Sequence, residues 1–323
     1  MIRCIFISTW YYEHAFEKIM NNDALMIRVT VHRRSIFPKV VTPNMIMLEG
    51  MKSGGVINGR FRPEETGQNF TIAYRPERIG RGIQIRWDDN DVRFTELCLN
   101  LPSSEEELDD FFRMSARLAR QDISEVLIND KPFMPKEFHT IRESYRVYNL
   151  KLLHEMMGNV LNEPPGRISI GCVFHRLVAG EKEADRMWAG VDASVFRDWM
   201  HESQALDAYF SEARVEENDG EQDYRAVFPM PSGTTVILPD HEELPIRFYD
   251  LETGRPRYTI SEWLVELVDE STRRVIGQLP LGEFRSRLPQ DKISYFDAAD
   301  SLLEPFTVEE LQLLLGQADQ DHA

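Results

Sequence analysis

Residues 70–112 read FTIAYRPERIGRGIQIRWDDNDVRFTELCLNLPSSEEELDDFF, and this stretch decides the predicted fold. Apolar and polar side chains alternate along residues 83–87 and again after the turn-forming residues Asp88–Asp91, which is typical of a hairpin of half-buried strands. Ser103 and Ser104 then precede three glutamates, the composition of a capped helix start. With a strand predicted over residues 123–128, the order strand, hairpin, helix, strand favours an α+β fold.

The rest of the chain is predicted to contain antiparallel sheet-and-helix units and a C-terminal β-meander closed by a helix. Helices are expected over residues 145–161 and 193–211, with a strand over residues 168–177 between them. Thr307 and Glu310 form a second capping box before an apolar stripe, which predicts the closing helix.

Three parts are expected along the chain. Residues 1–60 are a poorly patterned N-terminal segment, in which residues 1–44 are hypothesised to be peripheral. Residues 61–215 form an α+β domain, and residues 224–323 form the β-meander plus C-terminal helices. The boundary is placed at residues 216–223, where five of eight residues are acidic and none is apolar.

Charge is distributed unevenly along the 323 residues, whose formal net charge is −17. Residues 1–100 carry +3 and residues 101–323 carry −20. Because nucleic-acid binding needs a basic footprint, we expect no nucleic-acid partner. A basic protein is the partner that this charge favours.

Segment hydropathy and cysteine usage favour a cytoplasmic protein with no membrane partner. No apolar run approaches the about 18 residues of a membrane helix, and the first 21 residues do not resemble a signal peptide. The three cysteines are far apart and odd in number, which argues against a disulfide framework. The oligomeric state is left open.

Sequence motifs for catalysis and metal binding are missing. His154, His201 and His241 each precede a glutamate, but none begins a complete HExxH motif. The nucleophile elbow and the dinucleotide fingerprint are also missing. We therefore expect no catalytic residue, no metal and no cofactor.

Candidate ligand-binding residues fall in two places. Arg75, Arg78 and Arg81 surround a Gly-x-Gly turn, and guanidinium groups with exposed backbone N–H groups suit an anion. The alternative is that these arginines pair with carboxylates of the same chain. His175 and Arg176 interrupt an apolar segment, so they either pair with nearby carboxylates or line a cleft.

Three segments, Arg78–Ile83, Pro102–Leu108 followed by Phe111 and Phe112, and Met200–Phe210, resemble an uncharacterised family of bacterial proteins of about 300 residues. The resemblance covers residues 70–315. It implies a bacterial cytosolic setting and no particular activity.

Two classes of function remain. The first is a non-catalytic binding protein that engages a basic protein, by analogy with toxin-neutralising immunity proteins. The second is an enzyme acting on an anionic small molecule held by the arginine cluster. The lack of catalytic motifs favours the first.

Overall fold

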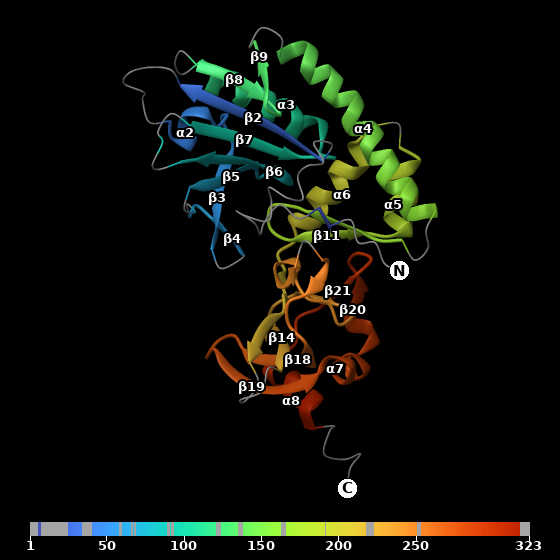
Figure 1. The fold of residues 1–323 in the computed structure, drawn as a ribbon. Helices are drawn as coiled ribbons and strands as arrows, with labels where there is room; N and C mark the ends of the chain where they lie inside the picture. The colour runs from blue at the N-terminus through green and yellow to red at the C-terminus, as the bar shows by residue number, and fades with distance from the viewer. Residues whose placement is uncertain are drawn as a thin grey trace. The chain divides into compact units, whose positions relative to one another are not determined.

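A computed structural model of the chain (Figure 1) shows two compact units, Met1–Ala205 and Leu206–Ala323, here called the N-terminal and C-terminal units. The structure describes residues 6–7, 25–33, 41–57, 60–65, 67, 69–88, 91, 94–120, 124–134, 138–162, 166–190, 192–217, 223–250 and 253–316. Helices and strands from separate parts of the sequence make up each unit, which confirms the α+β class.

An eight-stranded sheet forms the centre of the N-terminal unit, and all its neighbouring strands are antiparallel. The predicted hairpin is confirmed, with Gln84 opposite Cys98 and Trp87 opposite Thr95. In spatial order the strands are β4 (Arg60–Pro63), β3 (Lys52–Ile57), β5 (Phe70–Arg75), β6 (Arg78–Trp87), β7 (Phe94–Asn100), β2 (Met26–Arg33), β8 (Ser124–Ile128) and β9 (Lys131–Phe133).

Strand β2 corrects the hypothesis that residues 1–44 are peripheral. It lies inside the sheet, between β7 and β8. Met26, Ile27, Val29 and Val31 are almost completely buried. The local pattern of residues 24–31 does predict a strand, but the two partner strands come from distant parts of the sequence, so local periodicity could not place this strand inside the sheet. Most of residues 1–24 and 34–40 lie outside the described residues.

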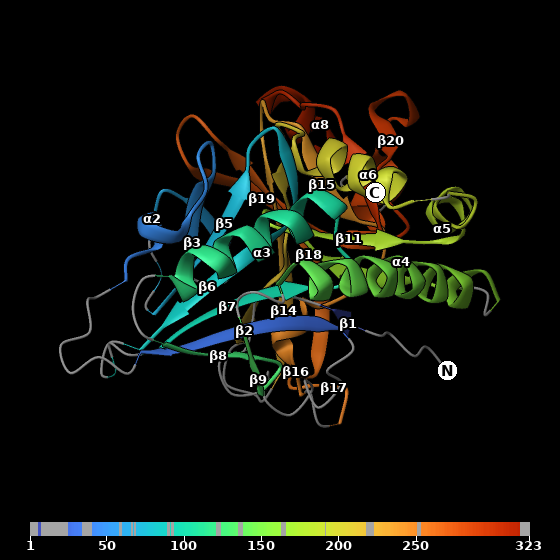
Figure 2. The same ribbon diagram turned by 90° about the horizontal axis from the view of Figure 1, so that it is seen from above.

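A helical layer covers the central strands of the sheet. Helix α3 (Glu105–Ala119) crosses β6, β7, β2 and β8, and α4 (Phe138–Asn162) packs against α3 (Figure 2). The predicted start of α3 is confirmed, because the Ser104 hydroxyl accepts a hydrogen bond from the Glu107 N–H at 3.1 Å. The other helices are α2 (Pro43–Ile46), α5 (Glu181–Trp188) and α6 (Ser194–Gln204).

Two predicted elements of this region differ from the observed ones. The strand expected over residues 168–177 is a hairpin of β10 (Ile168–Gly171) and β11 (Arg176–Ala179), and β1 (Phe6–Ile7) pairs with β10. The helix expected over residues 193–211 ends at Gln204. Its last residues instead form β12 (Tyr209–Phe210), where pairing with another strand overrides the helical pattern.

The C-terminal unit contains two four-stranded sheets and a small two-stranded one. The first has the order β12, β15 (Val236–Pro239), β21 (Asp300–Leu303), β20 (Ile293–Tyr295), and the second has the order β13 (Arg214–Glu217), β14 (Tyr224–Pro231), β18 (Ile260–Asp269), β19 (Arg274–Pro280). The remaining elements are β16 (Tyr249–Asp250), β17 (Arg255–Pro256), the 3-10 helices η2 (Ile246–Phe248) and η3 (Gln290–Lys292), and helices α7 (Leu281–Arg287) and α8 (Val308–Gly316).

This unit is only partly the expected antiparallel meander. The antiparallel pairing of β18 with β19 agrees with a meander, but β14 and β18 run parallel and β15 belongs to a different sheet from β14. Parallel pairing depends on a crossover connection, which strand patterns alone do not reveal. The acidic stretch 216–223 is not a boundary between the two units, because its first two residues belong to β13, which pairs with β14 within the C-terminal unit.

Helix α8 closes the apolar core of the C-terminal unit, as predicted. Leu311 and Leu314 are buried together with Phe284 and Phe306. The Thr307–Glu310 capping box is reciprocal, with the Thr307 N–H donating to Glu310 at 2.7 Å and the Glu310 N–H donating to the Thr307 hydroxyl at 3.2 Å. No helix in the described part of the chain combines the length and apolar character needed to cross a membrane.

Candidate functional site

Arg75, at the end of β5, is held by helix α3. Its Nε and Nη2 both donate to the Asp110 carboxylate, with Nη2 to Oδ1 at 3.2 Å, and its Nη1 donates to the Glu49 carbonyl at 3.1 Å. The Asp110 side chain is only 6% exposed. The hydrogen bond to Asp110 raises the pKa of Arg75, so this guanidinium is committed to a carboxylate of its own chain.

Arg78 and Arg81 lie three residues apart on β6 and therefore project from opposite faces of the strand. Arg78 is partly exposed, with Nη1 3.9 Å from Glu106 Oε1. Arg81 is fully buried, and burial lowers its pKa to about 10. Its Nε donates to the Gly171 carbonyl at 3.1 Å, and its Nη1 donates to the carbonyls of Leu101 and Pro102. The three predicted arginines therefore do not converge on one cavity.

The Gly-x-Gly segment lies within strand β6 and is not a turn, but it does present a backbone N–H to an anion, the Glu107 carboxylate of α3. The Gly82 N–H donates to Glu107 Oε1 at 2.8 Å, and the Ser103 hydroxyl donates to Oε2 at 2.6 Å. A Cβ at Gly80 would lie 2.5 Å from Oε2. A side chain at Gly80 would therefore force the Glu107 carboxylate to shift, because the carboxylate packs directly against the strand.

His175 is the last residue of a loop that docks beside the same strand, and Arg176 follows as the first residue of β11. The Val173 N–H donates to the Gly80 carbonyl at 3.0 Å. Gln204 of α6 fixes the loop by accepting from the His175 N–H and donating to the His175 carbonyl at 3.0 Å. Burial lowers the pKa of His175 to about 3, so its imidazole is neutral at pH 7.

Strand β6 near Gly80, the first turn of α3 with Glu107, the loop with Val173 and helix α6 meet here. We call this cluster the β6 junction. His201 Nδ1 accepts a hydrogen bond from the Ile79 N–H at 3.1 Å. All three segments that carry the family resemblance thus contribute to one structural centre. Beside it, a hollow lined by Arg75, Arg78 and Glu106 has a volume of about 10 Å³. That is room for about one water molecule, whereas small-molecule sites span roughly 300–1,000 Å³.

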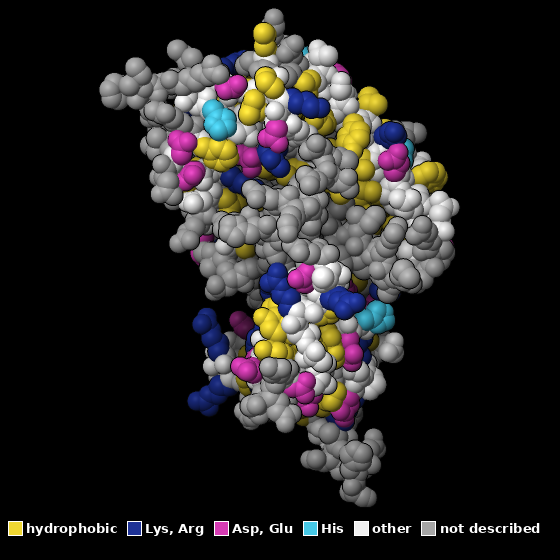
Figure 3. All heavy atoms as spheres, viewed as in Figure 1, with side chains coloured by type: hydrophobic (Ala, Val, Ile, Leu, Met, Phe, Trp, Pro, Cys, Tyr) yellow, Lys and Arg dark blue, Asp and Glu magenta, His cyan; other side chains and the backbone are white. Residues whose placement is uncertain are grey.

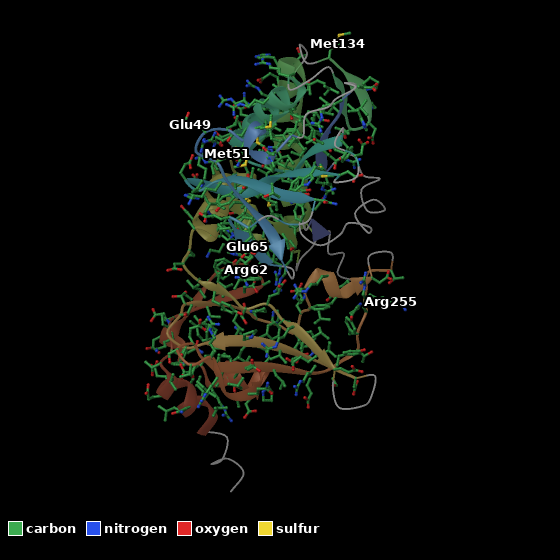
Figure 4. All side chains as sticks on the ribbon, turned by 90° about the vertical axis from the view of Figure 1, so that its left-hand side faces the viewer. Glu49, Met51, Arg62, Glu65, Met134 and Arg255 are labelled. Atoms are coloured by element: carbon green, nitrogen blue, oxygen red, sulfur yellow. The ribbon has the colours of Figure 1, made fainter. Side chains whose placement is uncertain are left out.

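A larger hollow of about 430 Å³ lies on the exposed side of α3, and we call it the α3 groove. Arg113, Arg117 and Arg120 line it together with Arg75 and Glu49. Figure 4 shows Glu49 pointing outward from the edge of the N-terminal unit. This groove was not among the sites predicted from the sequence, although arginines spaced i, i+4 and i+7 on a predicted helix indicate a shared basic face.

The C-terminal unit carries most of the excess of acidic residues. Residues 206–323 contain 25 acidic and 10 basic residues, against 29 and 27 in residues 1–205. On the face shown in Figure 3, basic and acidic side chains are interspersed. Six basic residues of the C-terminal unit form ion pairs inside it: Arg214 with Glu216 and Glu266, Arg225 with Glu216, Arg247 with Glu212, Arg285 with Asp240, Arg287 with Glu283, and Lys292 with Glu310.

Several exposed carboxylates gather around η3 and the start of α8. Asp291, Glu304 and Glu309 are exposed, and no ion pair involves them within the described part of the chain. Lys292 holds the region together, with Nζ donating to Glu310 Oε1 at 2.6 Å and to the Pro305 carbonyl at 3.1 Å. We call Asp291, Glu304, Glu309 and Glu310 the acidic edge.

Metal and thiol chemistry add little to these sites. Within the described residues, no three His, Cys, Asp or Glu side chains are grouped so that they could hold a metal ion. Cys98 and Cys172 are buried free thiols, and burial raises the pKa of Cys172 to about 12. Cys4 lies outside the described residues.

Comparison with known proteins connects the chain to one family. No curated protein and no solved structure matched it. The family described as "Domain of unknown function (DUF4299)" matches residues 50–314, a range that contains the β6 junction, the α3 groove except its rim residues Leu48 and Glu49, and the acidic edge. The chain therefore belongs to the DUF4299 family.

Proposed function

We propose that this chain is a non-catalytic, cytoplasmic interaction protein whose C-terminal unit binds a basic protein partner. The observation that carries the proposal is the acidic edge, where exposed carboxylates lie next to a lysine already committed to Glu310. Buried free thiols at Cys98 and Cys172 suit a reducing compartment.

The acidic edge also has apolar neighbours that suit a protein interface. Leu313 is 67% exposed and lies one turn after Glu309 on α8. Tyr295, on β20 shortly after Lys292, is 49% exposed. Aromatic and apolar side chains beside charges are the composition of an interface core with a polar rim. Complementary charge would mainly raise the association rate and select a basic partner.

Co-purification from host extract tests the proposal with two variants of equal charge change. D291K/E304K/E309K reverses the acidic edge, and E242K/E262K/E270K reverses exposed carboxylates elsewhere in the same unit. We expect wild type and the second variant to retain one stoichiometric basic protein, released by salt, and the first variant to lose it. Equal loss in both variants would show that only bulk charge matters, and a neutral or acidic partner would contradict the proposal.

A further inference from the structure

The α3 groove has the size of a ligand site and an unusual lining. Its volume of about 430 Å³ falls within the range of small-molecule sites. Four of its lining side chains are arginines, none is lysine, and Glu49 is the only acidic one. Guanidinium forks match the geometry of phosphate oxygens and can bind them bidentately.

The geometry of α3 explains why the arginines share one side. Arg113, Arg117 and Arg120 follow at i, i+4 and i+7, and all three are exposed, whereas Leu108, Phe111 and Leu118 are buried. Ala116 lies between the arginines and leaves the groove open. At 1.5 Å per residue, the three guanidinium groups are distributed over roughly 10 Å of helix axis.

Two sides of the groove are held in place by hydrogen bonds. Arg117 Nη1 donates to the Met47 carbonyl at 2.6 Å, and Arg75 Nη1 donates to the Glu49 carbonyl at 3.1 Å. Both bonds connect the segment before β3 to the arginine-bearing elements. A site whose walls are already ordered loses less conformational entropy when a ligand binds.

Among the described residues, the four arginines of the groove face three carboxylates, Glu49, Glu77 and Asp110, which leaves one positive charge in excess. Asp110 is taken by Arg75 and lies 3.9 Å from Arg113 Nη1. Arg120 is exposed, and its guanidinium makes no ion pair with the residues that the structure describes. The C-terminal end of α3 disfavours an anion by about half a charge, which is less than the charge of the Arg120 guanidinium.

We infer that the α3 groove binds a small molecule that carries two or more phosphoryl groups. Several phosphoryl groups can reach successive arginines along the helix, whereas one group can reach only one or two. The net charge of −17 disfavours a long polyanion such as nucleic acid. A small anion inside the groove lies within about 8 Å of the arginines, so at physiological salt their local field dominates.

Calorimetric titration of the full chain with phosphate, pyrophosphate and tripolyphosphate tests this inference. We expect affinity to rise along that series and to fall with salt. R113Q/R120Q should weaken tripolyphosphate binding by about tenfold or more, because two charge-assisted contacts are lost. Both side chains are exposed, so the variant should fold normally, and R273Q/R274Q supplies a matched pair of exposed arginines in the C-terminal unit that should leave binding unchanged.

Glu49 gives a test of opposite sign. E49Q removes the carboxylate at the rim and keeps the main-chain carbonyl that holds Arg75, so tripolyphosphate should bind several-fold more tightly. Equal affinity for all three anions, equal binding by R113Q/R120Q and wild type, or citrate binding as tight as tripolyphosphate would each overturn the inference. Absence of binding to wild type at millimolar concentrations would do the same.

Discussion

Arg81 is a full positive charge enclosed by protein, and its position depends on main-chain carbonyls. Removing a guanidinium from water costs several kcal/mol unless its donors find acceptors. Gly171, Leu101 and Pro102 supply those acceptors, and the nearby Glu107 carboxylate favours the charged form. The residue thus ties β6 to the end of β10 and to the segment between β7 and α3.

Replacing Arg81 with methionine should therefore lower the free energy of unfolding by about 3–5 kcal/mol, because three carbonyls and Glu107 lose a partner in a dry interior. Arg78→Met is the matched control, since Arg78 is 39% exposed and its ion pair is long. The control should cost less than about 1 kcal/mol. Denaturant unfolding measures both, and similar losses would contradict the structural role of Arg81.

His175 should make stability depend on pH below neutrality. Burial is the main cause of its pKa of about 3, with Arg176 contributing, against 6.5 for an exposed histidine. Between about pH 6.5 and 3 the unfolded chain therefore binds one more proton than the folded chain, so stability falls as pH falls. The slope is about 1.4 kcal/mol per pH unit well inside that window.

His175→Gln removes this dependence, so the loss of stability between pH 7 and pH 5 should be smaller in the variant than in wild type. His241 is exposed on the C-terminal unit, and His241→Gln is the control. Unfolding curves at the two pH values provide the measurement. An unchanged pH dependence in the His175 variant would show that the imidazole already titrates near its normal pKa when folded.

At the scale of elements, α3 performs two tasks with two faces. Its apolar side, including Leu108 and Phe111, packs on the sheet, and its first turn places Glu107 against β6. Its outer side presents the arginines of the groove. Both faces belong to one helix, on which side chains four residues apart lie on the same face. A rotation of α3 would therefore displace Glu107 from β6 and the arginines from the groove together.

The contact between α3 and β6 predicts that Gly80→Ala destabilises the protein by about 1–3 kcal/mol, because the new methyl group would displace the Glu107 carboxylate. Gly282→Ala is the control in α7, where an added Cβ meets no atom within 4 Å. That change should be neutral or stabilise by up to about 1 kcal/mol. If thermal unfolding shows the same effect for both, the close packing at Gly80 is wrong.

At the scale of the whole molecule, each unit has its own sheets and its own core. Strands β12 to β21 pair only with one another among the described residues. Their core includes Phe228, Phe284 and Phe306, all buried. Charge follows the same division, since the N-terminal unit is nearly balanced and the C-terminal unit is strongly acidic.

Residues 206–323 should therefore fold when expressed alone. Their length lies in the usual range of a domain, and their strands need no partner from the N-terminal unit among the described pairs. Circular dichroism and dispersed amide NMR signals would show a folded unit with a cooperative thermal transition. A non-cooperative transition would mean that the two units depend on each other for stability.

The sequence by itself determined the elements whose signals are local. The β6–β7 hairpin, the Ser104 cap of α3 and the Thr307–Glu310 box of α8 each depend on residues within one turn or one alternation, so their patterns could be recognised directly. Only the tertiary structure decided the rest, because burial and pairing there come from distant residues. It placed β2 inside the sheet and made β14 parallel to β18. In the tertiary structure, the anion beside Gly82 is the Glu107 carboxylate, and the arginines of α3 line a groove. Sequence spacing can show neither of these.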